Sequence, residues 1–155
     1  MNALLSIKPE FAEKILSGGK EYEFRKTLFS DPEEVDTIFL YASSPVQRVV
    51  GAFTMADVIS DNPANLWQKY GHSSGIADRS RFMSYFDGTE EGYAIEVGEV
   101  HEFDTPIDPA QVVDDFSPPV SFYYIQDGSE FDMARKLPKA MSGTDSPDPL
   151  QYSSD

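Results

Sequence analysis

A short segment near the N-terminus collects cations in a chain that is otherwise strongly acidic. The segment SIKPEFAEKILSGGKEYEFRK, from Ser6 to Lys26, holds five of the twelve Lys and Arg residues, namely Lys8, Lys14, Lys20, Arg25 and Lys26. The whole chain carries a formal net charge of -15. Cations gathered in one place inside an acidic envelope suit a local site for an anion better than a long nucleic-acid track.

The acidity of the remaining chain has two interpretations, and composition does not decide between them. A sequence pI of about 4.3 argues against broad binding to phosphate backbones, because that affinity comes largely from cations that release counterions. A strongly acidic surface is also typical of proteins from a salt-rich cytoplasm, where hydrated carboxylates keep the protein soluble.

The residue types and patterns that the chain lacks argue against several kinds of site and cellular location. The chain has no cysteine, which excludes disulfides, thiol nucleophiles and thiolate metal sites. His72 and His101 lack metal-ligand spacing, so we expect no metal site, and no motif predicts a cofactor. The chain contains no run of about 18 apolar residues, so we expect no membrane span. The N-terminus lacks a signal-peptide pattern. We therefore expect a cytoplasmic protein that does not enter membranes.

The 155 residues are enough for one ordinary domain with little left over. We expect this domain to cover residues 1–126. In residues 127–155, an acidic tail rich in Ser and Pro, apolar residues thin out, so part of the tail cannot bury enough surface to offset its ordering entropy. A short helix around Met133, Ala134 and Leu137 is a further expectation.

The helix that carries part of the basic segment has clear sequence limits. Pro9 suits the first turn of a helix because its missing N–H has no partner there in any case. Apolar residues then recur at helical spacing until Gly18 and Gly19, which predict the end of the helix. Residues 21–26 alternate instead, with Tyr22 and Phe24 on one face and charged residues on the other, which predicts a strand.

The rest of the domain is mostly strand. Five further strands are expected at residues 3–7, 36–42, 48–60, 91–103 and 121–125. The strands at 36–42 and 48–60 are expected to form a hairpin, and the strand at 91–103 is expected to carry a bulge at Gly98. Two helices are expected between residues 62 and 86. This pattern predicts an α+β fold, a small and mostly antiparallel β-barrel of five to six strands with two to three helices packed on one side.

The segment Ser6 to Lys26 resembles the opening motif of the ASCH domain family. The stretches LYASSPVQRVVGAF, NLWQKYGHSSGI, YFDG, GYAIEV and PPVSFYYI occur in the order found in small single-domain ASCH proteins of archaea and bacteria. The similarity covers roughly residues 3–125, and its N-terminal motif is the most specific part. The resemblance implies a PUA-like barrel with a cleft between barrel and helices that serves RNA or modified-nucleotide recognition.

The resemblance also suggests which side chains line that cleft. The residues it brings into consideration are Lys8, Lys20, Glu23, Arg25, Tyr41, Ser43, Trp67 and Ser121. Arg25 can present a bidentate fork to phosphate or a base edge, Lys20 a compact charge, and Glu23 an acceptor for an exocyclic amino group. The aromatic residues are candidates for stacking an unpaired base, and the serines add hydroxyls at the rim.

Each of these assignments has a plainer alternative. Glu23 and Arg25, two apart on a strand, can pair with each other on the sheet face. Tyr22, Phe24 and Trp67 have the spacing of core residues. A cation at the position of Lys8 gains nothing from the dipole of the helix that follows it, which favours a ligand role for that residue.

Three functions are compatible with the pattern. The main hypothesis is an RNA- or modified-nucleotide-binding protein with a Lys/Glu/Arg pocket and no chemistry, regulatory in RNA metabolism or transcription. The alternative is a small hydrolase that acts on an acylated nucleoside such as N4-acetylcytidine, or on RNA, with Lys20 and Glu23 as catalytic residues. One ASCH branch uses a lysine, a threonine and a glutamate for the first reaction, but the threonine position here is Glu23. A third function is contact with a basic protein partner through the acidic surface.

Overall fold

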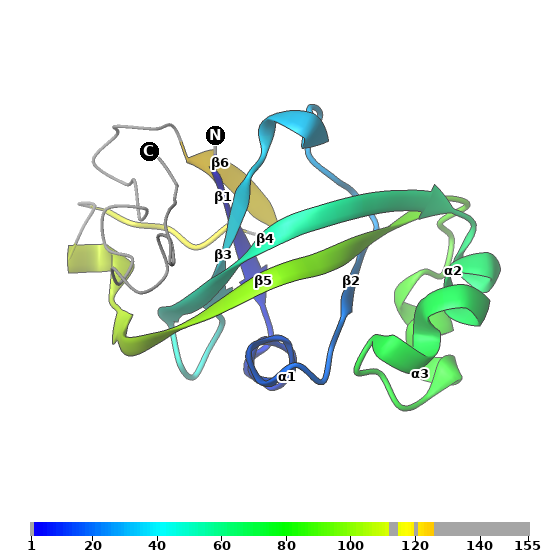
Figure 1. The fold of residues 1–155 in the computed structure, drawn as a ribbon, viewed down its shortest axis with the longest axis horizontal. Helices are drawn as coiled ribbons and strands as arrows, with labels where there is room; N and C mark the ends of the chain where they lie inside the picture. Colours follow the sequence, from blue (N-terminus) through cyan, green and yellow to red (C-terminus); the bar gives the residue numbers. More distant parts are fainter. Residues whose placement is uncertain (1, 112–114, 120, 126–155) are drawn as a thin grey trace.

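One six-stranded sheet forms the centre of the computed structural model, which describes residues 2–111, 115–119 and 121–125. The strands are β1 (Asn2–Ile7), β2 (Tyr22–Arg25), β3 (Thr37–Ala42), β4 (Arg48–Asp61), β5 (Gly92–Ile107) and β6 (Phe122–Ile125). The helices are α1 (Pro9–Ser17), α2 (Pro63–Tyr70) and α3 (Arg79–Tyr85), with short 3-10 turns at Pro32–Glu34, Gly71–Ser73 and Pro109–Gln111 (Figure 1). The predicted tail helix lies outside the described residues.

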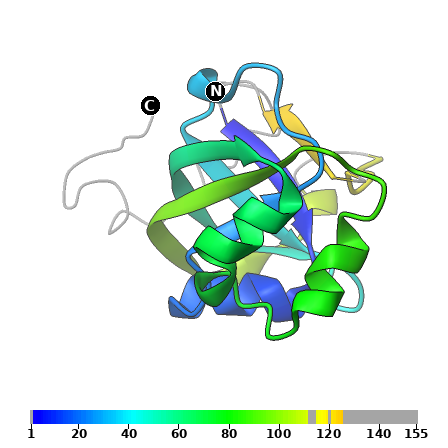
Figure 2. The same cartoon turned by 90° about the vertical axis from the view of Figure 1, so that its right-hand side faces the viewer.

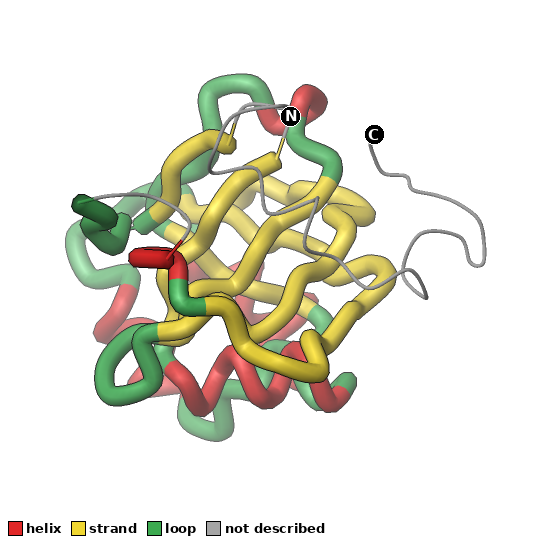
Figure 3. The backbone as a smooth tube through the Cα atoms, turned by 90° about the vertical axis from the view of Figure 1, so that its left-hand side faces the viewer, coloured by secondary structure: helices red, strands yellow, loops and turns green. Residues whose placement is uncertain are grey.

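The strand order is β2-β5-β4-β3-β1-β6. All neighbours are antiparallel except β1 and β3, which run parallel. The sheet curls strongly, as the strand layers in Figure 3 show, and Arg25 at the end of β2 reaches the carbonyl oxygens of Ser6 and Ser121 near the other edge. The predicted α+β class with a mostly antiparallel curled sheet is therefore confirmed.

The antiparallel pair β4–β5 is the longest part of the sheet and carries the predicted bulge. Phe53 pairs with Val100 and Met55 with Val97, so two residues of β5 lie opposite one residue of β4. Thr54 fills this irregularity, because its Oγ1 accepts a hydrogen bond of 2.8 Å from the Glu99 N–H. The strand continues to Ile107, four residues beyond the predicted end.

Local sequence determines both ends of α1 as expected. Pro9 is its first residue, and Gly18 ends it in the left-handed conformation with φ of 89°, which glycine adopts without a steric penalty. The Gly19 and Lys20 N–H groups both donate to the Lys14 carbonyl oxygen, at 2.8 and 3.1 Å. The chain therefore turns sharply and places Lys20 directly before β2.

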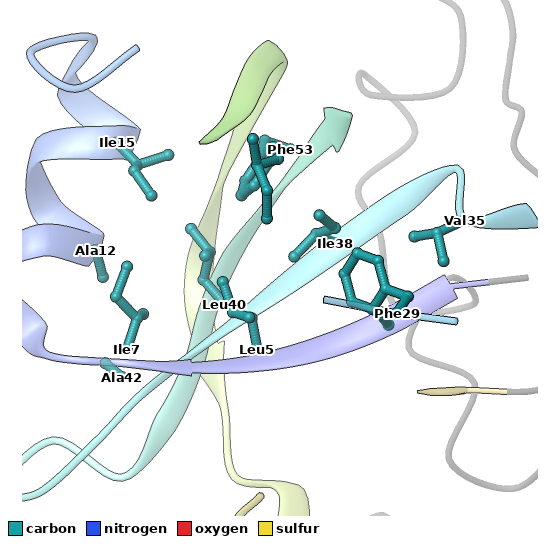
Figure 4. Close-up of a cluster of buried hydrophobic side chains, with 12 residues drawn as sticks. Leu5, Ile7, Ala12, Ile15, Phe29, Val35, Ile38, Leu40, Ala42 and Phe53 are labelled. Atoms are coloured by element: carbon teal, nitrogen blue, oxygen red, sulfur yellow. The ribbon is translucent and has the colours of Figure 1, made fainter. Parts of the chain in front are cut away.

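The core has two layers around β1 and β3. On the inner face, α1 packs over side chains of both strands through Ala12 and Ile15, and Figure 4 shows this cluster. On the opposite face, Leu4 and Phe39 join a second cluster that includes Phe103. The continuous apolar run of residues 36–42 therefore forms a strand buried on both faces, as predicted.

The helices α2 and α3 lie at the end of β4 and the start of β5, as Figures 1 and 2 show, and their side chains form a third cluster. Phe82 of α3 is fully buried at its centre, with ring centroids 4.8 Å from both Phe24 and Phe86. Phe24 belongs to β2, so this cluster attaches the helices to the strand that carries Glu23 and Arg25. No helix in the described ranges is long and apolar enough to span a membrane.

Candidate functional site

Lys20, Glu23 and Arg25 form one charged group, as the sequence predicts. Glu23 lies in the middle, with its Oε1 3.4 Å from Lys20 Nζ and its Oε2 2.9 Å from Arg25 Nη1. The sharp exit from α1 positions Lys20, and alternation along β2 places Glu23 and Arg25 on the same face. The pairing of Glu23 with Arg25, which the sequence offered as the plainer alternative, is therefore part of the group.

The group is buried to different depths. The side chains of Lys20 and Glu23 are 1% and 6% exposed, and that of Arg25 is 12% exposed. Buried charges are costly unless they are paired and hydrogen-bonded. The arrangement satisfies this requirement for Lys20 and Glu23 and leaves Arg25 as the member nearest to solvent.

Lys20 is held from two further directions. Its Nζ donates a hydrogen bond to the Ser74 carbonyl oxygen and lies 5.1 Å from the ring centroid of Phe11 on α1. Burial lowers the pKa of Lys20 below its ordinary value, although the nearby Glu23 carboxylate opposes this effect. The loop before α3 and the helix α1 thus close over one ammonium group.

This burial predicts a pH dependence of stability. Because the pKa of Lys20 is lower in the folded chain than its ordinary value of 10.5, the unfolded chain binds more protons between these two values, and stability gains from Lys20 as pH rises. We therefore expect the free energy of unfolding of wild type, relative to that of Lys20→Met, to rise between pH 8 and pH 10. This window is chosen from the reference lysine titration. Urea unfolding of both proteins at each pH measures the difference, and parallel curves would contradict the prediction.

Arg25 connects β2 to the opposite edge of the sheet. Its Nη2 donates to Ser121 Oγ at 2.9 Å and to the Ser6 and Ser121 carbonyl oxygens at 3.3 Å each. Its Nε is buried and has no hydrogen-bond partner among the described residues. The structure therefore brings the predicted Ser121 to the charged group and leaves one guanidinium donor for a further acceptor.

Two further residues lie at the rim of this group, Lys26 of the basic segment and Tyr85, for which the sequence gives no site signal. Tyr85 on α3 is 40% exposed, and Lys26 Nζ lies 4.9 Å from its ring centroid. Burial of its hydroxyl raises the pKa of Tyr85, and the neighbouring Arg25 partly offsets this. Arg25, Ser121, Lys26 and Tyr85 thus form a partly open, cationic rim over the buried Lys20 and Glu23.

The other predicted residues share no hydrogen bond or ion pair with Lys20, Glu23 or Arg25 among the described residues. Lys8 is exposed before α1 and makes no side-chain cap, and Ser43 is half-buried, with its N–H on the Ile7 carbonyl oxygen at 2.9 Å. Tyr41 is 3% exposed on the opposite face of the sheet, where burial raises its pKa. Trp67 packs on the α2–α3 cluster, 5.1 Å from Phe82.

Across residues 2–111, 115–119 and 121–125, no three His, Cys, Asp or Glu side chains gather where they could hold a metal ion. The chemistry available at the rim is that of a guanidinium, an ammonium and hydroxyl groups. Such groups bind and stabilise anionic oxygens.

Known proteins share both the sequence and the architecture. The chain is 31% identical to an ASCH domain-containing ribonuclease of Zymomonas mobilis over 127 residues, which cover 80% of this chain and 84% of the relative. A segment making up 13% of the ATP synthase subunit alpha of Ureaplasma parvum is also 31% identical, over 69% of this chain. The crystal structure of the ASCH protein from Zymomonas mobilis superimposes with a TM-score of 0.74, at 28% identity, covering 81% of this chain and 88% of that one.

A variant of the Zymomonas mobilis protein with a serine replaced by alanine gives a TM-score of 0.75 at 27% identity, over 84% of this chain and 90% of that one. The six-stranded arrangement with three helices is thus the same architecture. The sequence model of the ASCH domain matches residues 5–106, a span that contains Lys20, Glu23 and Arg25. The chain therefore belongs to the ASCH domain family.

Proposed function

We propose that this chain is an RNA-cleaving hydrolase in which Arg25 and Ser121 meet the phosphate that is cleaved. The observation that carries the proposal is the half-satisfied guanidinium of Arg25, held on Glu23 and Ser121 with its Nε unpaired. The relationship to a Zymomonas mobilis protein described as a ribonuclease, over most of both chains, supports RNA as the substrate. This favours the hydrolase hypothesis over a pocket that only binds.

A phosphate that enters at the rim, once the side chains that cover Arg25 Nε move aside, would satisfy this buried and unpaired donor. An unmade hydrogen bond on a buried donor costs about 1–3 kcal/mol, so an acceptor at Arg25 Nε is favoured energetically. Guanidinium groups also match phosphate oxygens in a planar, two-point geometry. Ser121 Oγ adds a hydroxyl beside that fork, 2.9 Å from Nη2.

Arg25 would stabilise the charge that develops during cleavage. As the neighbouring 2′-oxygen, whose proton passes to water, forms its bond to phosphorus and the bond to the 5′-oxygen breaks, with that oxygen taking a proton from water, negative charge grows on the non-bridging oxygens. A preorganised donor aimed at that charge accelerates the reaction because it needs no rearrangement at the moment of reaction. The hydrogen bonds to Glu23 and Ser121 hold Arg25 in place beforehand.

Lys20 and Glu23 are assigned positioning roles in this proposal. Their side chains are 1% and 6% exposed, and both Glu23 oxygens are already engaged by cations. They therefore hold Arg25 rather than touch a polymer. Proton transfer by Glu23 or Lys20, which the sequence suggests for a hydrolase, stays a prediction.

A substrate comparison tests the proposed function. Purified protein is incubated with a labelled single-stranded RNA, with DNA of the same sequence, and with N4-acetylcytidine. We expect the RNA to be shortened and the other two compounds to persist. Intact RNA that still binds the protein in fluorescence anisotropy would return the chain to the binding hypothesis, and conversion of N4-acetylcytidine would support the amidohydrolase alternative.

A further inference from the structure

A large groove lies beside the charged group, between α2, the loop of residues 71–77 and the end of α1. Its volume is about 980 Å³, and its lining includes Lys14, Trp67, Gln68, His72 and Arg79. This volume is near the upper end of the range of about 300–1,000 Å³ that is typical of ligand sites. The groove is therefore large enough for more than a single small group.

The lining of the groove is cationic although the chain is acidic. Two cations, Lys14 and Arg79, line it, and no Asp or Glu does. Neither cation forms an ion pair with a carboxylate of the described residues. Lys14 uses one donor on the Gly75 carbonyl oxygen at 2.7 Å, which leaves two of its three N–H groups. The electrostatic complement of this surface is an anion.

The groove shares a wall with the charged group. Ser74 in the loop accepts a hydrogen bond from the buried Lys20, and Gly75 accepts one from Lys14. A Cβ on Gly75 would stand 3.1 Å from Lys14 Cδ and 3.3 Å from Lys20 Cβ, which shows how closely the loop packs on both lysines. The loop of residues 71–77 therefore separates the groove from the buried Lys20 and contacts both.

Trp67 contributes to the wall of the groove. A Cβ on Gly71 would lie 2.6 Å from the indole Cδ2, so the backbone at Gly71 covers one side of the ring. Phe82 lies 5.1 Å from it, centroid to centroid. Base stacking on this indole, for which the sequence makes Trp67 a candidate, therefore fits the structure less well than contact with the ring edge. The groove is better suited to phosphates than to stacked bases.

We propose that this groove holds backbone phosphates of single-stranded RNA, one or more nucleotides away from the phosphate bound at Arg25. The inference rests on the proposed function for the identity of the anion, and it adds a second binding region with Lys14 and Arg79 as phosphate contacts. Phosphate contacts give affinity without sequence preference. Longer RNA should consequently bind more tightly than a dinucleotide, whatever its sequence.

Binding of non-cleavable RNA tests the inference. Fluorescence anisotropy is measured with 2′-O-methyl RNA of two and of eight nucleotides, on wild type and on Lys14→Gln/Arg79→Gln. The loss of two charge-assisted contacts should weaken binding of the longer oligomer by about tenfold or more. The slope of log K against log salt concentration should fall in magnitude by about 1.4, at about 0.7 for each phosphate contact. Binding of the dinucleotide should be nearly unchanged.

Lys69→Gln is the matched control. Lys69 belongs to α2 like Trp67, but its side chain is 58% exposed, faces Asp61 at 3.6 Å and does not line the groove. Removing its charge should change affinity much less than the double variant does. Arg79→Gln alone is the second variant, because Arg79 is exposed and its replacement leaves the hydrogen bond from Lys14 to Gly75 in place.

The outcomes separate this inference from the proposed function. If wild type cleaves RNA and the double variant binds the longer oligomer as Lys69→Gln does, the groove inference is wrong and the function stands. If wild type cleaves no RNA but loses oligomer binding on the double substitution, the function is wrong and the groove binds phosphates. If wild type neither cleaves RNA nor binds the longer oligomer, both are wrong.

Discussion

Replacing Arg25 with Gln should lower the rate of RNA cleavage by about 10²–10³-fold, the loss typical of removing one preorganised donor from a transition state. Gln is shorter, uncharged and unable to form the planar fork of a guanidinium. Because Arg25 is proposed to act on the developing charge, the loss should fall mainly on kcat. Arg25→Lys keeps the charge without the fork and should fall between wild type and Arg25→Gln. Steady-state kinetics on a labelled RNA measures all three proteins.

Arg48→Gln provides the control for this comparison. Arg48 is on β4, its side chain is 44% exposed, and its Nη2 lies 4.0 Å from Asp108 Oδ2. The substitution therefore removes a positive charge that is not part of the rim. Equal rates for Arg25→Gln and Arg48→Gln, with both proteins folded by circular dichroism, would show that cleavage does not depend on Arg25.

Replacing Glu23 with Gln should destabilise the chain by about 3–5 kcal/mol, the range measured when one partner of a buried ion pair is removed. The Glu23 side chain is 6% exposed and lies between two cations. The amide keeps the shape of the side chain but leaves both cations without a negative partner. Urea unfolding of wild type and variant at neutral pH measures the difference.

Two further variants make this result specific. Glu10→Gln is the same chemical change in an exposed ion pair, where the Glu10 and Arg81 side chains are about half exposed, and exposed pairs contribute little. In the second variant, Lys20→Met on the Glu23→Gln background removes one of the two uncompensated charges and should recover part of the lost stability. A Glu23→Gln midpoint as close to wild type as that of Glu10→Gln would contradict the account of the buried group.

Much of the fold could be predicted because its determinants are local. Pro9 and Gly18 specify where α1 begins and ends through their own backbone preferences, and Gly98 indicates the bulge. The end of β5 could not be predicted in this way. Residues after Phe103 read as irregular and include Pro106, but pairing of Ile107 with Val49 extends the strand, and such pairing depends on a distant part of the chain.

The site was predictable only in part for a similar reason. Alternation placed Glu23 and Arg25 on one face, and the family resemblance added Lys20 and Ser121. The partners of Lys20 and Arg25 include the carbonyl oxygens of Ser74, 54 residues away, and of Ser121, 96 residues away. A backbone carbonyl is present at every residue and therefore gives no sequence signal.

Aromatic residues show where sequence pattern is ambiguous. The sequence makes Tyr41 and Trp67 candidates for contact with a base, yet the spacing that exposes a ring to a ligand also buries it in a core. The structure places Tyr41 in the cluster on the outer face of β3 and Trp67 against Phe82. Tyr85, which does lie near Arg25, follows the same helical pattern as its buried neighbour Phe86.

The central claim is that an RNA phosphate binds the guanidinium of Arg25, and the most direct measurement is the NMR signal of its Nε–H group. A 2′-O-methyl trinucleotide is added to isotope-labelled protein, and the signal is assigned by its loss in Arg25→Lys. The account predicts a progressive shift of the Arg25 Nε–H signal together with the backbone signals of Ser121 and Lys26. An unmoved Nε–H signal, while signals around Tyr41 and Arg48 shift, would place RNA on the other face of the sheet and contradict the account.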